Sequence, residues 1–305
     1  MFYDKPLKKV LRYVSRLGYE SVEIPSKDYS SFDEWNPSPH MNVDDVLKGG
    51  ATKYKNLIKK FKLSISALSD HERWHLGPDP EKKRKANDHF KKTVEAAQAL
   101  DVPVVVGFTG CPDWSAWFSW PPTNVDVWEY GWREFKEVWG ELSDFALDHD
   151  VKIAHEVHPQ NMAYNLETAQ RMFEEVPNKS LGINFDPCEY YWQRIDPVLA
   201  IYTHRDRIYH CHAKDIEIVT PYLSRSGVCC TGTWDKIDRG FRYRTVGWGD
   251  LNWKKLITAL IQVGYNSVLS YEHEDPIMSA EDGAEKAIRY LTPLLIQKPV
   301  KKIWW

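Results

Sequence analysis

The sequence has no long hydrophobic run, and this limits the classes of protein to which it can belong. No stretch approaches the roughly 20 apolar residues that a membrane-spanning helix requires. The first residues, MFYDKPLKK, do not contain the apolar core of a signal peptide. Hydrophobic residues make up 43% and charged residues 27% of the 305-residue chain, a balance typical of soluble folded proteins. We therefore expect a cytoplasmic protein with no membrane attachment.

The chain also has few cysteines and no excess of positive charge. Its five cysteines form no CxxC pair and are odd in number, which argues against a disulfide framework. The formal net charge is -3, and the lysines and arginines are scattered among acidic residues. Proteins that bind nucleic acid usually carry a basic surface that neutralises phosphates. We therefore expect no nucleic-acid partner.

A linker rich in Pro, Gly or Ser is missing too, so no domain boundary is indicated. Helix-like segments instead alternate with strand-like ones, which predicts a parallel sheet. The expected strands cover residues 21–24, 64–69, 103–108, 151–157, 181–186, 207–213 and 267–272. This pattern indicates an α/β fold, the (β/α)8 TIM barrel. We expect one barrel domain over residues 1–295 and a C-terminal tail over residues 296–305.

Such a barrel has eight strands, whereas seven are predicted. The opening MFYDKP resembles the loop after a first strand, so we expect that strand to be short or missing. Phe2 and Tyr3 would then form a stub in the gap, with the tail KKIWW or a partner chain as alternative plugs. An unpaired strand edge invites pairing, and we expect a homo-oligomer or a smaller partner subunit.

What the sequence does contain is a metal-binding type of side chain at the ends of four predicted strands. These residues are Glu156, Asp186, His212 and Glu272. A lone acid at a strand end is more often a solvated group, but in a parallel barrel the carboxyl ends of the strands converge on one face. Three carboxylates and one imidazole suit Mn²⁺, Mg²⁺ or Co²⁺, and Zn²⁺ is also compatible. We expect one divalent metal ion, with Mn²⁺ as the first choice.

The predicted metal site indicates a class of chemistry. A divalent cation can hold two neighbouring sugar oxygens and stabilise the enediolate that forms when a carbon-bound proton is removed. Glutamates at such a site can exchange protons with the substrate. Residues two apart in a strand face the same side, so His158 lies with Glu156. We therefore take Glu156, Glu272 and His158 as the candidate catalytic residues.

Several motifs together carry a family resemblance: GYESVEIPS, ISALSDH, VGFTG, INFDPCEYYWQRIDP, RIYHCHAKD, VGWGDLNW and VLSYEHEDP. They resemble the xylose isomerase-like TIM barrel superfamily, in its sugar phosphate isomerase/epimerase branch, from about residue 6 to residue 295. The resemblance implies that Glu156, Asp186, His212 and Glu272 bind a divalent metal and that the two glutamates form the acid/base pair. It implies an enzyme that isomerises or epimerises a sugar or sugar derivative.

One position departs from the family. Where FDPSH is usual, this chain has FDPCE, so Glu189 replaces a histidine. An ionised carboxylate cannot donate a hydrogen bond but can accept one from a sugar hydroxyl. The chain also resembles the catalytic subunit of C-glycoside deglycosylases, which eliminates an aglycone from a 3-oxo-sugar with a smaller partner subunit. A lyase of this kind is the first alternative.

Further residues are candidates for contact with the substrate. Trp114 and Trp117 lie in a tryptophan-rich segment after a predicted strand, and tryptophan faces stack well on sugars. Packing of that segment against its neighbours is the competing interpretation. The remaining candidates follow predicted strands and are His71, Glu189, Lys214 and Glu274.

Two other classes of function stay open. An abasic-site endonuclease shares the barrel, but that family assembles three zinc ions from many histidines, and Glu189 replaces one of them. A noncatalytic sugar-binding subunit agrees with the incomplete first strand. The four intact ligand positions argue against it.

Overall fold

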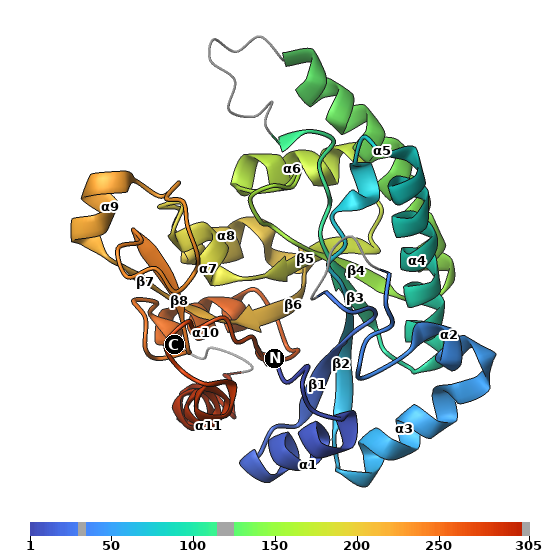
Figure 1. The fold of residues 1–305 in the computed structure, drawn as a ribbon, viewed down its shortest axis with the longest axis horizontal. Helices are drawn as coiled ribbons and strands as arrows, with labels where there is room; N and C mark the ends of the chain where they lie inside the picture. Colours follow the sequence, from blue (N-terminus) through green and yellow to red (C-terminus); the bar gives the residue numbers. More distant parts are fainter. Residues whose placement is uncertain (30–34, 115–124, 301–305) are drawn as a thin grey trace. The chain divides into compact units, whose positions relative to one another are not determined.

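The structure is a computed structural model and describes residues 1–29, 35–114 and 125–300. The chain divides into two compact units, which are described separately (Figure 1). The N-terminal unit comprises Phe2–Phe185 and Arg207–Cys211. The C-terminal unit comprises Asp186–Asp206 and the chain from His212 onward, together with Met1.

Parallel strands form the centre of the N-terminal unit. In sheet order and in chain order they are β1 (Ser21–Pro25), β2 (Ser64–Asp70), β3 (Val104–Gly107), β4 (Lys152–Glu156), β5 (Leu181–Phe185) and the first part of β6 (Ile208–Ala213). Each strand pairs in parallel with the next one. The carboxyl ends of these strands therefore lie at the same edge of the sheet.

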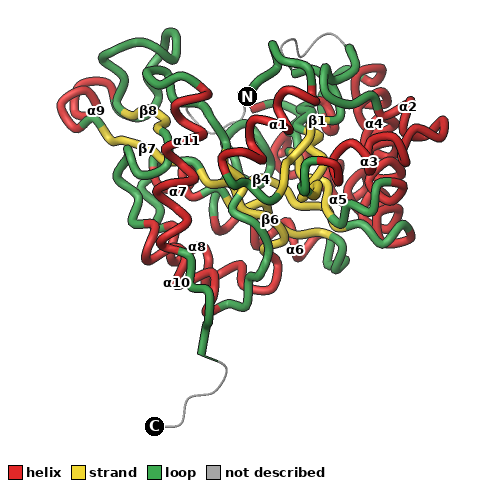
Figure 2. The backbone as a smooth tube through the Cα atoms, turned by 90° about the horizontal axis from the view of Figure 1, so that it is seen from below, coloured by secondary structure: helices red, strands yellow, loops and turns green. Residues whose placement is uncertain are grey.

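Helices connect the strands of this unit. They are α1 (Leu7–Leu17), α2 (Val43–Asp45), the π-helical turn η1 (Val46–Gly50), α3 (Ala51–Lys60), the 3₁₀ turn η2 (Trp74–Leu76), α4 (Pro80–Ala99), α5 (Val125–Asp148) and α6 (Leu166–Glu175). In both backbone views α3, α4 and α5 lie along one side of strands β2 to β4 (Figure 1, Figure 2).

Local sequence explains where these helices begin and end. Helix α4 starts at Asp79, whose carboxylate accepts hydrogen bonds from the backbone N–H groups of Glu81 and Lys82. Pro80 occupies its first turn, where a missing N–H costs nothing. Helix α1 ends at Gly18, whose φ of 98° is the left-handed conformation that glycine adopts without strain.

An aromatic stripe fixes α5 against the sheet. Trp132, Phe135 and Trp139 follow one another at helical spacing and are almost fully buried. The ring of Trp139 lies edge-to-face 4.0 Å from that of His155 in β4. His155 therefore faces away from its neighbour Glu156, as the strand alternation predicted.

The C-terminal unit begins with short helices and continues into a second sheet. The far end of β6 pairs in parallel with β9 (Ser270–Tyr271). Strand β7 (Asp215–Ile218) pairs in antiparallel fashion with β8 (Phe241–Arg244). The helices are α7 (Pro187–Tyr191), α8 (Pro197–His204), α9 (Thr220–Ser226), α10 (Trp253–Gln262) and α11 (Ala280–Leu291), with the 3₁₀ turns η4 (Arg205–Arg207) and η5 (Thr292–Leu294).

Buried Asp215 anchors the segment VGWGDLNW of this unit. Its carboxylate accepts hydrogen bonds from the backbone of Gly247 and Leu251 and from the indole of Trp253. A Cβ atom at Gly249 would lie 2.3 Å from Asp215 Oδ1, so only glycine fits there. This motif therefore stabilises the fold around β7.

The seven predicted strands are confirmed, and β9 is shorter than the predicted 267–272. Within the described residues, no strand precedes β1. Phe2 is instead buried at 5% exposure and packs edge-to-face against Tyr13 of α1. Phe2, which was predicted to belong to a short stub of the first strand, thus contributes a packed side chain and no strand. The tail KKIWW lies outside the described residues.

The β7–β8 hairpin was not predicted. In this hairpin Arg242 and Arg244 of β8 alternate with buried Phe241 and Tyr243. Both arginines pair with Glu217 on the opposing strand.

Among the described residues, no helix is both long enough and apolar enough to cross a bilayer.

Candidate metal centre

Three of the four predicted ligands come together in the C-terminal unit. Asp186 follows β5 and caps α7 by accepting a hydrogen bond from the backbone of Cys188. His212 lies in β6, and Glu272 comes directly after β9. Each of the three offers an N or O atom within 4.8 Å of the others. Asp186 and His212 are almost fully buried, so this is an interior cluster of metal-binding atoms.

Lys214 lies in the middle of this cluster. Its ammonium is 2.9 Å from oxygens of Asp186, Glu272 and Glu274. The side chain is 3% exposed. Burial by itself would lower the pKa of Lys214, but the surrounding carboxylates hold that pKa well above its usual range. Lys214 is therefore a permanent cation, and it binds two of the predicted ligands.

Glu189, the departure from the family motif, is completely buried. It accepts hydrogen bonds from the Tyr243 hydroxyl at 2.8 Å and from the Trp192 indole at 3.0 Å. Its distance to the Lys214 ammonium is 3.6 Å. Both carboxylate oxygens thus have partners within the unit.

Glu156, the fourth predicted ligand, lies at the end of β4 in the N-terminal unit. It is 3% exposed and accepts a hydrogen bond from the side-chain amide of Asn184 at 3.2 Å. Nε2 of His71 lies 3.5 Å from the same carboxylate. His71 was predicted to contact the substrate, and the structure brings it to the carboxylate predicted to be catalytic.

His158 also lies beside Glu156. Atoms of the two side chains come within 4.8 Å of each other. The Phe108 ring contacts both histidines, because its centroid lies 4.7 Å from that of His71 and 5.1 Å from that of His158. A carboxylate flanked by two imidazoles and an aromatic ring is suited to proton transfer.

Of the two predicted tryptophans, one can be placed. The Trp114 ring packs edge-to-face on Tyr164, with centroids 5.6 Å apart. This contact agrees with the competing interpretation, in which the segment packs against its neighbours. Trp117 lies outside the described residues.

A buried polar chain behind Glu156 was not predicted. Asn184 of β5 donates to Glu156, and its carbonyl oxygen lies 3.0 Å from Nδ1 of His210 in β6. Nε2 of His210 lies 3.7 Å from a carboxylate oxygen of Glu23 in β1. The strand period contained a signal for Asn184, because that residue lies two positions before Asp186 and shares its face.

The donor atoms fit a divalent cation that prefers oxygen and nitrogen. Carboxylates and one imidazole supply the cluster. The sulfur of Cys188, the buried thiol next in sequence, lies 3.0 Å from the backbone oxygen of Lys214, as a donor to it. Mn²⁺, Mg²⁺, Co²⁺ and Zn²⁺ all remain compatible with this set.

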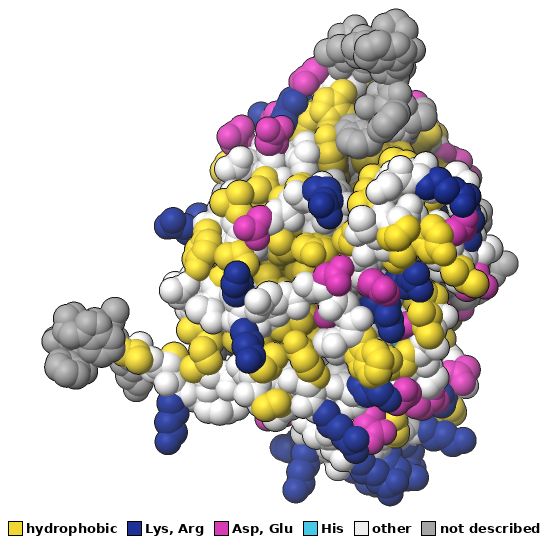
Figure 3. Space-filling view, turned by 90° about the vertical axis from the view of Figure 1, so that its left-hand side faces the viewer, with side chains coloured by type: hydrophobic (Ala, Val, Ile, Leu, Met, Phe, Trp, Pro, Cys, Tyr) yellow, Lys and Arg dark blue, Asp and Glu magenta, His cyan; other side chains and the backbone are white. Residues whose placement is uncertain are grey.

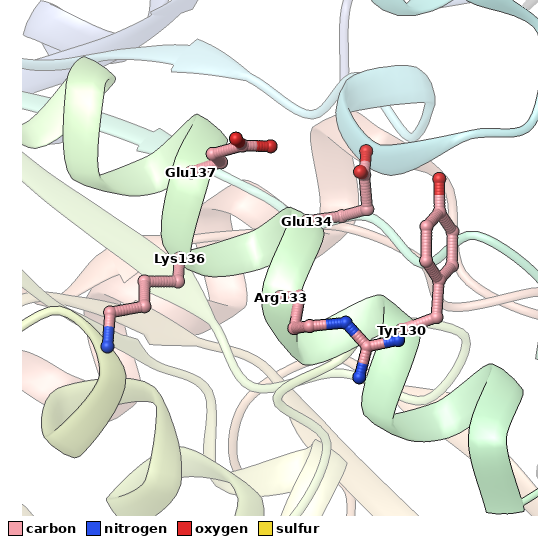
Figure 4. Close-up of a pocket in the computed structure, with 5 residues that line it drawn as sticks. All are labelled: Tyr130, Arg133, Glu134, Lys136 and Glu137. Atoms are coloured by element: carbon pink, nitrogen blue, oxygen red, sulfur yellow. The ribbon is translucent and has the colours of Figure 1, made fainter.

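The surface carries charged side chains of both signs and a hollow on helix α5. On the face drawn in Figure 3, basic and acidic side chains are interspersed with hydrophobic ones. A hollow of about 560 Å³ on α5 is lined by Tyr130, Arg133, Glu134, Lys136 and Glu137 (Figure 4). Glu134 is already paired with Lys83, and Lys136 with Glu175. This hollow has none of the predicted ligands among its lining residues.

Several known proteins are similar to this chain. The "Uncharacterized protein YfiH" of Bacillus subtilis (strain 168) is 28% identical over 309 residues, which cover 96% of each chain. Solved structures with the same fold include the 3-keto-D-glucoside 4-epimerase YcjR from E. coli, with 17% identity, coverage of 96% and 95%, and a TM-score of 0.68. The IOLI protein with a bound zinc atom has 20% identity, coverage of 95% and 93%, and a TM-score of 0.69. D-psicose 3-epimerase from Clostridium cellulolyticum H10, solved with D-tagatose, has 14% identity, coverage of 96% for both chains, and a TM-score of 0.66.

A family model described as "Xylose isomerase-like TIM barrel" matches residues 11–294. This range begins in α1 and ends in the last turn after α11, so it includes every strand of the parallel sheet. The resemblance seen in the sequence motifs is thereby confirmed, and so is the barrel class of the fold. The chain belongs to the xylose isomerase-like TIM barrel family.

Proposed function

We propose that this protein is a divalent-metal-dependent sugar isomerase or epimerase that removes a proton from a carbon next to a carbonyl. The observation that carries the proposal is the cluster of Asp186, His212 and Glu272, whose donor atoms lie within 4.8 Å of one another. Asp186 and His212 are buried, Glu272 is 31% exposed, and two carboxylates with an imidazole at this spacing are typical of a metal centre.

Strand register supports Glu156 as the fourth ligand. Within the N-terminal unit Glu156 pairs with Asn184, which precedes Asp186 by two residues. In the same unit Phe185 pairs with Cys211, and these two residues directly precede Asp186 and His212. Asp186 therefore directly follows the strand that pairs with the strand of Glu156, and His212 directly follows a residue of the next strand in the sheet.

The proposed reaction uses the two glutamates as proton carriers. A bound divalent cation would polarise the substrate carbonyl and make the neighbouring C–H group more acidic. One glutamate, Glu156 or Glu272, takes that proton from the carbon, and the other supplies a proton to the opposite face, which inverts the centre. His71, 3.5 Å from Glu156, orients its carboxylate or relays its proton.

The similar proteins agree with this proposal. Two of the structures with the same fold are titled as epimerases of a keto-glucoside and of psicose, and a third holds zinc. A sugar or sugar derivative is therefore the proposed substrate class. Mn²⁺ is our first choice of metal, and zinc is the alternative that the IOLI structure favours.

Hydrogen exchange tests the proposal. The purified protein is incubated in D₂O with Mn²⁺ and a panel of ketoses and 3-oxo-glycosides, and the sugars are analysed by NMR and mass spectrometry. Solvent deuterium at the carbon next to the carbonyl, with a new epimer or isomer, supports the proposal. Release of an aglycone instead assigns the lyase alternative, which shares the first proton abstraction. Failure of every sugar to exchange would contradict both.

A further inference from the structure

The Lys214 ammonium contacts the same oxygens that a metal would need. It lies 2.9 Å from Asp186 Oδ2 and 2.9 Å from Glu272 Oε2, and both residues belong to the proposed ligand set. The contact with Glu272 is a charge-assisted hydrogen bond, which belongs to the strong class of such bonds, and the contact with Asp186 is an ion pair at the same distance. A divalent cation bound by Asp186 and Glu272 must compete with this ammonium for their oxygens.

We propose that Lys214 is an internal cation that competes with the metal, and that Glu189 is the residue that holds it when the metal is bound. In the metal-free protein Lys214 neutralises the ligand carboxylates. With metal present, its ammonium turns toward Glu189 and Glu274. This inference rests on the metal site of the proposed function. It identifies Lys214 and Glu189 as residues that set the affinity of that site for its metal ion.

The surroundings of Lys214 provide the second position. Glu274 lies 2.9 Å and Glu189 3.6 Å from the ammonium, and the ring of Tyr243 lies 4.6 Å from it. Loss of Asp186 and Glu272 as partners therefore leaves two carboxylates and an aromatic face. This matters because a buried charge that loses every partner is strongly destabilising.

Glu189 is fixed for this role. The hydroxyl of Tyr243 and the indole of Trp192 each donate to one of its oxygens, so the carboxylate cannot swing toward the ligand residues without losing them. A neutral histidine at this position, as in the usual FDPSH motif, offers an ammonium no opposite charge. The departure from the family motif thus acquires a physical reason: the negative charge of Glu189 draws Lys214 away from the metal ligands.

The binding of Mn²⁺ and of Zn²⁺ by the full chain, measured by titration calorimetry, tests the inference. Lys214→Met should bind either ion about tenfold or more tightly than the native protein, because the competing cation is gone. Its metal-free form should melt at a lower temperature, because carboxylates are left without their counter-charge, and added metal should restore more of that loss. Lys286→Met, which removes an ammonium paired with Asp282 on α11, is the matched control. Unchanged or weaker binding by Lys214→Met overturns the inference.

A double-mutant cycle separates this competition from a simple change in charge. Glu189→Gln should weaken metal binding several-fold in the native background, because Lys214 then stays on Asp186 and Glu272. In the Lys214→Met background the same substitution should have a much smaller effect. An equal effect in both backgrounds would mean that Glu189 acts on the metal directly, and would overturn its assigned role. If Lys214→Met does not fold, Lys214→Gln takes its place in the cycle.

These measurements need no substrate, so their failure differs from failure of the proposed function. Tight binding of one ion that Lys214→Met strengthens, without exchange of any sugar, would retain the inference and reject the isomerase. If a sugar exchanges its proton with solvent and Lys214→Met binds metal as the native protein does, the isomerase proposal stands and the inference about Lys214 is rejected.

Discussion

Glu156 has the surroundings expected of a catalytic carboxylate. It is buried, it accepts one hydrogen bond from Asn184, and His71 lies 3.5 Å away. Both neighbours hold the carboxylate in position. This differs from Glu272, which the Lys214 ammonium contacts directly. These neighbours of the two proposed proton carriers therefore differ: an amide and an imidazole at Glu156, and an ammonium at Glu272.

Glu156→Gln should reduce turnover by about a thousandfold or more, because the amide keeps the shape of the side chain but can neither accept the proton nor contribute negative charge to the cation. Deuterium exchange into the accepted sugar measures the loss. Glu141→Gln, at a side chain 69% exposed on α5, is the control for the chemical change itself. Undiminished exchange in Glu156→Gln would remove Glu156 from the mechanism.

Asn184 should affect turnover and metal binding, because its side-chain amide holds the Glu156 carboxylate in position. Asn184→Leu removes the donor to that carboxylate while keeping a similar volume, and residues that orient ligands typically contribute 10- to 100-fold to metal affinity or activity. We expect a loss of about that size, mainly in kcat, together with weaker metal binding. Asn184→Asp, which offers no amide donor and adds a charge, should be at least as impaired. A Leu variant with native kinetics would make the hydrogen bond irrelevant.

The sequence was sufficient to propose Asp186, His212 and Glu272 as metal ligands, which stays a prediction, because each lies at or directly after the end of a strand that its apolar residues reveal. It was not sufficient for Tyr243, whose hydroxyl bonds to Glu189 across 54 positions of the chain. No local pattern encodes a contact of that separation. Lys214 was predicted to contact the substrate, which stays a prediction, and the carboxylates that surround it in the structure could not be read from the sequence.

Among the secondary-structure elements, the strands of the parallel sheet were the most predictable, since their short apolar runs alternate with helical segments that carry many polar residues. Strands β7 and β8 were not found, because four residues of mixed polarity carry little information by themselves. Their pairing depends on ion pairs between Glu217 and the arginines of β8. Tertiary contacts therefore specify this hairpin.

The packing of α8 on α7 should make stability depend on pH. His204, at the end of α8, is buried and lies 3.1 Å from the Tyr190 hydroxyl of α7, and burial lowers its pKa from 6.5 to about 4. The unfolded chain therefore binds a proton between about pH 4 and 6.5 that the folded chain does not. Stability from this group is complete above pH 6.5 and falls, by at most about 1.4 kcal/mol per pH unit, as the pH drops through that window.

Chemical denaturation between pH 4 and 7 measures this effect. His204→Gln, which can still hydrogen-bond to Tyr190, should flatten the dependence of the free energy of unfolding on pH in that window. His149→Gln, in the turn that follows α5, serves as the comparison. An equally steep dependence in His204→Gln would show that other groups control acid stability.

For the whole molecule, metal binding should couple to folding. The proposed ligands Glu156, Asp186, His212 and Glu272 are far apart in the sequence, so only the folded chain can bring them together. An ion that binds only the folded chain stabilises it by about 2.7 kcal/mol when present at 100 times its Kd. We expect chelation to lower the melting temperature by several degrees and one equivalent of Mn²⁺ or Zn²⁺ to restore it.

Elemental analysis of the same sample should find one divalent ion per chain. About three zinc ions would favour the endonuclease alternative, and complete indifference of the melting temperature to chelator and metal would favour a noncatalytic role. The fold alone does not decide among these, because one barrel can host many chemistries.

The most direct test of the central claim is the anomalous diffraction of a crystal grown with Mn²⁺ or Zn²⁺. The account predicts one strong peak, about 2.0–2.2 Å from ligand atoms of Glu156, Asp186, His212 and Glu272, with the Lys214 ammonium turned toward Glu189. A peak that excludes Glu156, or one located away from these four residues, would contradict it.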